Sequence, residues 1–343
     1  MLSNILNIYC KNIFNNFLIA ESCCTRTHLF QKLPSPAPAP APESRNAPVL
    51  HRVCAGLPLA LVTVATALKN KSLFEWEDAL QQLRRPSPIH LTGMQAAIYS
   101  KIELSYKHLG TPVVKSFFLL CSQMGTISYQ DLVKYCFGLC LFPGICTLEE
   151  ARNKVYTLIR SLKDSCLLLE DPRTSKFVRM HDLVRDVAIL IAKDENMFSV
   201  RNDDPVKWPD EDALTMCTSI SVLARDTHEL PDGLVCPKLK LLYVDGRDRD
   251  FKISETFFRG MRELKVLDLT KMRLSSLPSS INLLTNLQTL CLDQCVLKDI
   301  AVIGELKNLE ILSLLYSKFT PVAKRNRAPD SFTVVGFVKL YQT

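Results

Sequence analysis

The strongest constraint on the fold of this chain is a leucine pattern that recurs near its C-terminal end. Five segments share the form L-x-x-L-x-L with conservative substitutions; they begin at residues 217, 239, 264, 287 and 309, which are 22, 25, 23 and 22 residues apart. They are "CTSISV", "LKLLYV", "LKVLDL", "LQTLCL" and "LEILSL". One such segment cannot bury its own leucines, whereas stacked segments bury a continuous row. The spacing therefore predicts a stack of short strands and excludes a leucine zipper, whose heptad period does not fit.

Repeat lengths of roughly 20–29 residues are typical of leucine-rich repeats. We therefore expect a leucine-rich-repeat solenoid over residues 206–320, with strands near the five positions given above. No further unit follows Leu314, and residues 321–343 are predicted to form an irregular tail. A solenoid end needs a polar cap, which this tail does not resemble, so we expect the array to be truncated there.

The segment before the repeats is predicted to be helical. In residues 48–110, "GLPLALVTVATALKN" opens with a Gly-Leu-Pro breaker before an apolar run, and Ser72 with Glu75 forms a capping box. The amphipathic run "MQAAIYSKIELSYKHLG" stops at Gly110. These features predict a domain built as a helical bundle.

Residues 111–205 are predicted to form a winged-helix domain. One helix begins at a second capping box, Thr147 with Glu150, and "CLLLE", the turn "DPRTS" and "KFVRM" then predict a small β-hairpin. Some winged helices bind DNA, but residues 111–200 carry eleven Lys/Arg against ten Asp/Glu. Phosphate contacts dominate DNA affinity, so this near-neutral balance favours a structural role without a nucleic-acid partner.

The N-terminal part has a different character. Residues 1–47 show no clear period and include the tract "PSPAPAPAP", so we predict a disordered segment there. No stretch reaches the roughly 20 apolar residues of a transmembrane helix, and no convincing signal peptide is present. The thirteen cysteines are mostly flanked by apolar residues, which favours free thiols in a reducing, cytoplasmic setting.

Catalytic motifs are missing from the sequence. It contains no G-x-x-x-x-G-K-[ST], no nucleophile elbow and no His-Glu-x-x-His, and its cysteines lack zinc spacing. We therefore predict no catalytic residues, no metal site and no enzymatic activity. One titratable pair, His181 and Asp182, lies between "KFVRM" and a helical pattern. Asp182 is expected to cap that helix, and an imidazole beside it could donate to an oxyanion.

Four motifs follow one another over roughly residues 48–320: "CAGLPLA", "SFFLLC", "RMHDLVRDVA" and the leucine repeats. In this order and spacing the chain resembles plant intracellular immune receptors of the nucleotide-binding, leucine-rich-repeat (NB-ARC/LRR) family, coiled-coil branch. The resemblance implies an ADP/ATP-dependent switch in defence. It also implies that the repeats restrain this switch and bind a protein partner, either a pathogen effector or a guarded host protein.

The resemblance further implies which residues bind the nucleotide. They are Gly56, Leu57, Pro58, Leu59, His181 and Asp182. By this analogy Pro58 would pack near the adenine, and His181 would reach the β-phosphate of ADP and hold the off state closed.

The chain departs from that family at its N-terminal end. The P-loop, the magnesium-binding strand and the coiled coil are absent, and residues 1–47 resemble none of them. We therefore expect a partial receptor with weak nucleotide binding or none, which a P-loop domain could complement in trans. Two alternatives stay open: a leucine-rich-repeat scaffold that binds no nucleotide, and a winged-helix DNA-binding protein.

Overall fold

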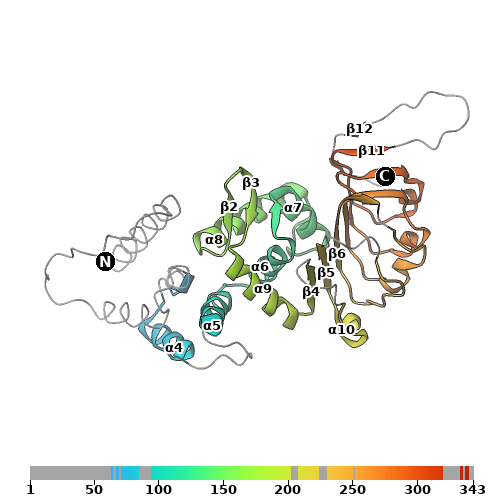
Figure 1. The fold of residues 1–343 in the computed structure, drawn as a ribbon. Coiled ribbons are helices and arrows are strands. Elements are labelled where there is room, and N and C mark those ends of the chain that lie inside the picture. Colours follow the sequence, from blue (N-terminus) through green and yellow to red (C-terminus); the bar gives the residue numbers. More distant parts are fainter. Residues whose placement is uncertain are drawn as a thin grey trace, which may run out of the picture. The chain divides into compact units, whose positions relative to one another are not determined.

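The computed structural model describes most of the chain between residues 63 and 319 and two short segments beyond it (Figure 1). The described residues are 63–64, 67–68, 71–84, 94–201, 208–223, 230–250, 252–319, 333–334 and 337–339. The predicted disorder of residues 1–47 lies outside them. The chain divides into two compact units, which we describe separately. The first comprises Met1–Lys115, Ile159–Leu169 and Met180–Val187, and the second comprises Ser116–Leu158, Glu170–Arg179 and Ala188–Thr343.

The first unit contains helices α4 (Leu73–Arg84) and α5 (Met94–Lys107). The capping box predicted at the start of α4 is confirmed: the backbone N–H of Ser72 donates to Glu75 Oε2 (2.8 Å), and the N–H of Glu75 donates to Ser72 Oγ (3.4 Å). Helix α5 ends shortly before Gly110, as predicted. Whether these helices complete a bundle over residues 48–110 stays a prediction, as do the other domain limits.

Three further helices follow α5 in the chain. Helix α6 (Pro112–Met124) starts with Pro112 as its first residue, α7 spans Tyr129–Gly138, and α8 spans Leu148–Asp164. The capping box of α8 is also confirmed, since Glu150 N–H donates to Thr147 Oγ1 and Thr147 N–H donates to Glu150 Oε2, both at 3.2 Å.

A three-stranded sheet accompanies these helices. Its strands are β1 (Thr126–Ser128), β2 (Leu169–Asp171) and β3 (Thr174–Arg179), in the order β1-β3-β2. Strands β2 and β3 form the predicted hairpin, and β1 pairs antiparallel with β3, placing Ile127 opposite Val178. Helix α9 (Asp182–Asp194) follows directly.

The five leucine segments form a parallel stack, as their spacing predicts. One strand begins in each of them: β5 (Ser219–Leu223), β6 (Leu241–Asp250), β7 (Val266–Ser276), β8 (Thr289–Cys291) and β10 (Ile311–Ser313). The register aligns their first residues across the sheet. The leucine-type side chains point into one buried row, which includes Ile220, Leu242, Leu267, Leu290 and Leu312. We call these five strands the repeat sheet.

The stack begins earlier than predicted. Strand β4 (Met197–Arg201) pairs parallel with β5, and Met197 lies opposite Ser219. The sheet therefore starts before residue 206, where we placed the boundary of the repeats. This strand lacks leucine and was missed, although Phe198 packs against the core and Val200 is buried in it. The short helix α10 (Glu211–Met216), capped by Asp210, lies between β4 and β5 in sequence.

The later repeats also have a second strand, or a second half of the same strand, that the sequence did not reveal. After β7, β8 and β10 begin, the chain turns at Lys271, Gln294 and Tyr316, whose φ angles of 54°, 57° and 60° are left-handed. The second half of β7 then pairs with β9 (Val296–Asp299), which pairs with β11 (Ser317–Phe319). Three 3-10 helices return the chain to the next strand: η2 (Phe257–Gly260), η3 (Ser279–Leu283) and η4 (Ala301–Glu305).

The predicted irregular tail is corrected in part. Strand β12 (Thr333–Val334) pairs antiparallel with β11, and β13 (Phe337–Lys339) pairs antiparallel with β10. The last parallel strand therefore has a backbone partner on its outer side. These two strands are antiparallel and carry no leucine repeat. Whether the array is truncated stays a prediction.

Candidate functional site

The predicted His181–Asp182 pair lies at the start of α9. The backbone N–H of Leu183 donates to His181 Nδ1 (3.2 Å), and the N–H of Arg185 donates to the His181 carbonyl (2.9 Å). Because Nδ1 accepts a hydrogen bond, the ring proton of a neutral His181 resides on Nε2. The structure thus gives the helix-capping role to His181, and not to Asp182 as predicted.

Asp182 is the first residue of the helix and points into solvent. Its side chain is 78% exposed and forms an ion pair with Arg185 (2.8 Å). Its negative charge at a helix N-terminus is favourable, but such an exposed pair contributes little to stability. The other predicted nucleotide-binding residues, Gly56, Leu57, Pro58 and Leu59, lie outside the described residues. Their relation to His181 therefore stays a prediction.

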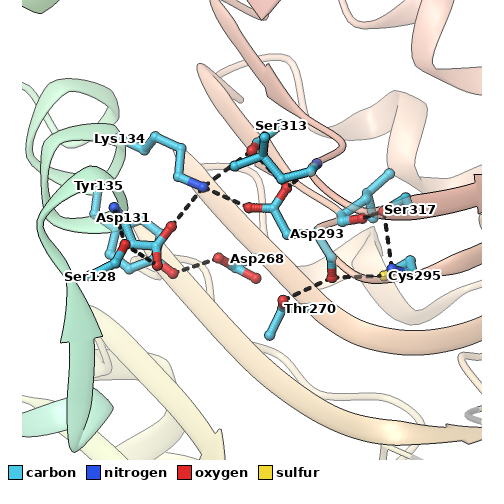
Figure 2. A network of polar contacts seen from close by, with 12 residues as sticks. Ser128, Asp131, Lys134, Tyr135, Asp268, Thr270, Asp293, Cys295, Ser313 and Ser317 are labelled. Atoms are coloured by element: carbon cyan, nitrogen blue, oxygen red, sulfur yellow. Dashed lines mark hydrogen bonds and ion pairs between the residues drawn. The ribbon is translucent and has the colours of Figure 1, made fainter. Parts of the chain in front are cut away.

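A second polar cluster, which the sequence analysis missed, lies where α7 meets the repeat sheet (Figure 2). The strand side chains that alternate with the leucines are buried here instead of facing solvent. At one edge, the end of α6 covers the sheet: Ser221 Oγ donates to the Gln123 carbonyl (3.0 Å). Farther along, Thr289 Oγ1 donates to the carbonyl of Lys134 in α7 (3.3 Å). The α7 helix thus packs on the face of the sheet opposite to the one from which the strand leucines point into the core.

Lys134 is the centre of this cluster and its side chain is fully buried. Its Nζ lies 2.7 Å from Asp131 Oδ1 and 2.8 Å from Asp293 Oδ2, and it donates to Ser313 Oγ (3.2 Å). Burial alone would lower the pKa of Lys134, but the acidic groups around it, the Cys291 thiol and the Asp131, Asp293 and Asp268 carboxyls, raise that pKa well above its ordinary value. Lys134 therefore remains an ammonium ion inside the contact.

Asp268, on β7, is the least solvated acid of the cluster. Its Oδ2 lies 2.5 Å from Tyr135 Oη, and its Oδ1 has no hydrogen-bond partner among the described residues. Burial raises the pKa of Asp268 to about 7, against the opposing effect of Lys134 and with added repulsion from Asp131. Burial, with Asp268 next, also raises the pKa of Tyr135 well above its ordinary value. Near neutral pH, Asp268 therefore binds a proton in part of the molecules.

The contact is close as well as polar. Gly138, the last residue of α7, lies against Thr289 and Val266, and an added Cβ would fall 2.8 Å from Val266 Cγ2. Together with the buried charges, this close approach makes α7 and the repeat sheet one packed structure. A sequence signal did exist: Lys134 and Asp131 interrupt an otherwise apolar helix face, and Asp268 interrupts a leucine strand. The sequence did not indicate that these residues would lie together.

Other kinds of site find no support in the described part of the chain. No group of three or more His, Cys, Asp or Glu side chains gathers there in a way that could hold a metal ion. Among the helices described, none combines the length and apolar character needed to cross a bilayer. The α7 cluster is largely buried between the helix and the sheet, where it joins two parts of the chain.

By its fold, this chain is a repeat protein whose leucine-bearing strands stack in one parallel sheet, with a helical segment docked on it. Comparison with curated proteins gives its relatives. It is 28% identical to the probable disease resistance protein At4g27220 of Arabidopsis thaliana, over 83% of the chain and 32% of that protein. It is 33% identical to the disease resistance protein RPS5 of the same plant, over 69% of the chain and 28% of that protein.

A third relative, the putative disease resistance protein At5g05400 of Arabidopsis thaliana, is 32% identical over 79% of the chain and 34% of its own length. The chain is therefore a relative of the plant disease resistance proteins, which confirms the resemblance drawn from its motifs. It spans about a third of the length of these curated relatives.

No protein-family model matches the chain. Among solved structures, an internalin from Listeria monocytogenes matches with a TM-score of 0.26 and 21% identity, over 36% of this chain and 43% of that one.

Proposed function

We propose that the chain acts in plant defence as a non-enzymatic segment that combines a nucleotide-dependent switch with a protein-interaction surface. The observation that carries the proposal is its similarity to disease resistance proteins over 69–83% of its length. The sequence order of helices, small sheet and repeats supports it. A cytoplasmic location agrees with the many cysteines flanked by apolar residues.

We infer that the three-stranded sheet and its helices form a winged-helix domain. The hairpin β2–β3 follows three helices, and β1 completes the sheet as it does in that arrangement. DNA binding is the weaker alternative, because residues 111–200 carry eleven Lys/Arg against ten Asp/Glu and α7 is occupied by the repeat sheet.

We propose further that Gly56, Leu57, Pro58, Leu59, His181 and Asp182 line one side of an ADP/ATP site. The capping geometry supports the part assigned to His181. With Nδ1 engaged by Leu183 N–H, the imidazole retains an Nε2–H donor at a helix N-terminus, a combination suited to a phosphate oxygen. A P-loop domain would supply the remaining phosphate contacts.

Two substitutions at His181 separate helix capping from nucleotide binding. His181→Ala removes both the cap and the Nε2–H donor, and is expected to destabilise the first turn of α9 by about 1 kcal/mol. His181→Asn keeps a capping oxygen but loses the imidazole. Hydrogen exchange of the α9 amides should rise in His181→Ala and stay near the wild-type rate in His181→Asn.

ADP titration of the full chain by calorimetry then tests the nucleotide role. We expect weak binding to the wild type that is reduced in both variants, since neither has the imidazole. If the wild type binds no ADP, or if His181→Asn binds as well as the wild type, the role of His181 in nucleotide binding is refuted. The first result would leave the repeat scaffold as the function.

The repeats are the proposed surface for a pathogen effector or a guarded host protein. A parallel stack offers a long surface that can contact an extended area of a partner. The face nearest α7 is covered by the chain itself, so we assign the partner to the remaining surface of the repeats.

A further inference from the structure

The contact between α7 and the repeat sheet holds more acidic groups than cations. From α7, the groups facing Asp268 are Asp131, Lys134 and Tyr135. From the sheet, they are Cys291 on β8 and, after β8, Asp293 and Cys295; Tyr243 on β6 lies near Tyr135. With Asp268 itself, the contact holds three carboxyls and one ammonium. With all three carboxyls ionised, the contact would carry a net charge of 1 − 3 = −2, and the charge on Asp268 would be buried, which is unfavourable.

Hydrogen bonds distinguish the three carboxyls. Asp131 contacts Lys134 Nζ (2.7 Å) and accepts from Ser128 Oγ (2.6 Å). Asp293 contacts the same ammonium and also accepts from Ser313 Oγ (2.7 Å) and Leu315 N–H (2.8 Å). Both ions are thus well solvated by the protein.

Asp268 lacks these partners. Its Oδ2 accepts a hydrogen bond from Tyr135 Oη, and its Oδ1 accepts from no group among the described residues. A buried carboxylate with a single neutral donor is poorly stabilised, whereas a protonated carboxyl requires no counter-ion. The surplus proton of the cluster therefore belongs on Asp268.

We propose that α7 docks on the repeat sheet with the uptake of one proton, held by Asp268, so that this contact tightens as the pH falls. The inference rests on the contact alone and does not depend on nucleotide binding. It makes the α7 contact a pH-sensitive element of the fold, in addition to the function proposed above.

The direction and range of the effect follow from linkage. When α7 leaves the sheet, water reaches Asp268 and its pKa returns towards about 3.9; in the docked state burial holds that pKa at about 7. Between these values only the docked state binds the proton, so docking weakens by up to tenfold for each unit of rising pH. Above about pH 7 both states are ionised at Asp268, and this dependence levels off.

Hydrogen–deuterium exchange of the full chain, read by mass spectrometry over pH 5 to 8, tests the proposal. After correction for the intrinsic pH dependence of exchange, protection of the α7 amides should fall by up to tenfold per unit towards pH 7 and then level. Asp268→Asn, which is neutral at every pH, should abolish this slope. The matched control Asp232→Asn, at an exposed turn of the repeats, should keep it.

Two further measurements test the proposal even if Asp268→Asn fails to fold. Asp131→Asn removes one negative charge from a partly exposed position, so the pH at which protection levels should move lower. Infrared spectroscopy of the wild type should show a protonated carboxyl band at pH 6 that fades by pH 8. Corrected protection of α7 that is independent of pH in the wild type, or a slope that persists in Asp268→Asn, would overturn the proposal, as would the absence of the infrared band.

Discussion

Replacement of Lys134 by methionine is expected to destabilise the second unit by about 3–5 kcal/mol at pH 7.5. The substitution removes a fully buried ammonium and leaves Asp131 and Asp293 without their cation, although methionine fills much of the space. The cost comes from the uncompensated carboxylates more than from lost packing. Denaturant unfolding followed by circular dichroism measures it as a lower midpoint for the repeat sheet.

The loss should depend on pH in a defined direction. At pH 7.5 the charge of Lys134 also stabilises ionised Asp268, whose pKa it lowers. At pH 5 Asp268, with a pKa of about 7, is protonated, so this part of the difference between Lys134→Met and the wild type should vanish. Lys107→Met is the matched control, because Lys107 pairs with Glu103 at 2.8 Å but has a 55% exposed side chain. We expect that control to cost less than about 1 kcal/mol. Equal losses at the two sites would show that burial of Lys134 has no energetic weight.

Gly138→Ala is expected to destabilise the α7 contact by about 1–3 kcal/mol, and Gly138→Leu by more. The new Cβ would overlap Thr289 Oγ1 and lie 2.9 Å from Thr289 Cβ and 2.8 Å from Val266 Cγ2. Both neighbours are β-branched side chains fixed on strands, so they cannot rotate away without disturbing the sheet. The helix must instead move outward, which also separates Lys134 from Asp293.

Gly304→Ala provides the comparison, since a Cβ at that position meets nothing within 4 Å. In a helix, alanine is otherwise favoured over glycine by roughly 1 kcal/mol. At Gly138 the steric clash therefore has to outweigh this gain in helix propensity before the substitution destabilises the protein. Thermal unfolding should give a clearly lower Tm for Gly138→Ala and little change for Gly304→Ala. A wild-type Tm in Gly138→Ala would mean that α7 does not lie this close to the sheet in solution.

The repeat strands could be predicted because their signal is periodic and local. Leucine spacing of 22 to 25 residues fixes both the strand positions and their parallel stacking. Strand β4 was not predicted because Met197–Arg201 carries no leucine. Only its pairing with β5 assigns it to the sheet. The second strands were not predicted either. They follow left-handed turns at Lys271 and Gln294, and these residue types do not indicate such a turn in the sequence.

The α7 contact could not be predicted because it joins residues far apart in the chain. Lys134 and Asp293 are separated by 159 positions, and neither residue type reveals its partner. The prediction of the residue that caps α9 was also wrong, although here the two candidates are neighbours in the chain. Aspartate is a better cap than histidine by preference, but the chain places His181 one position ahead of the helix, where its ring reaches the N–H of Leu183.

Strand β13 has a consequence for how molecules of this protein meet one another. The last strand of a parallel stack would present a row of unpaired backbone groups, and such a row can recruit a strand from a neighbouring chain. Here β13 runs antiparallel along β10, with Phe337 opposite Ser313 and Lys339 opposite Ile311. The pairing moves the edge from β10 to a strand of 3 residues, and an edge strand this short offers a neighbouring chain few backbone groups to pair with.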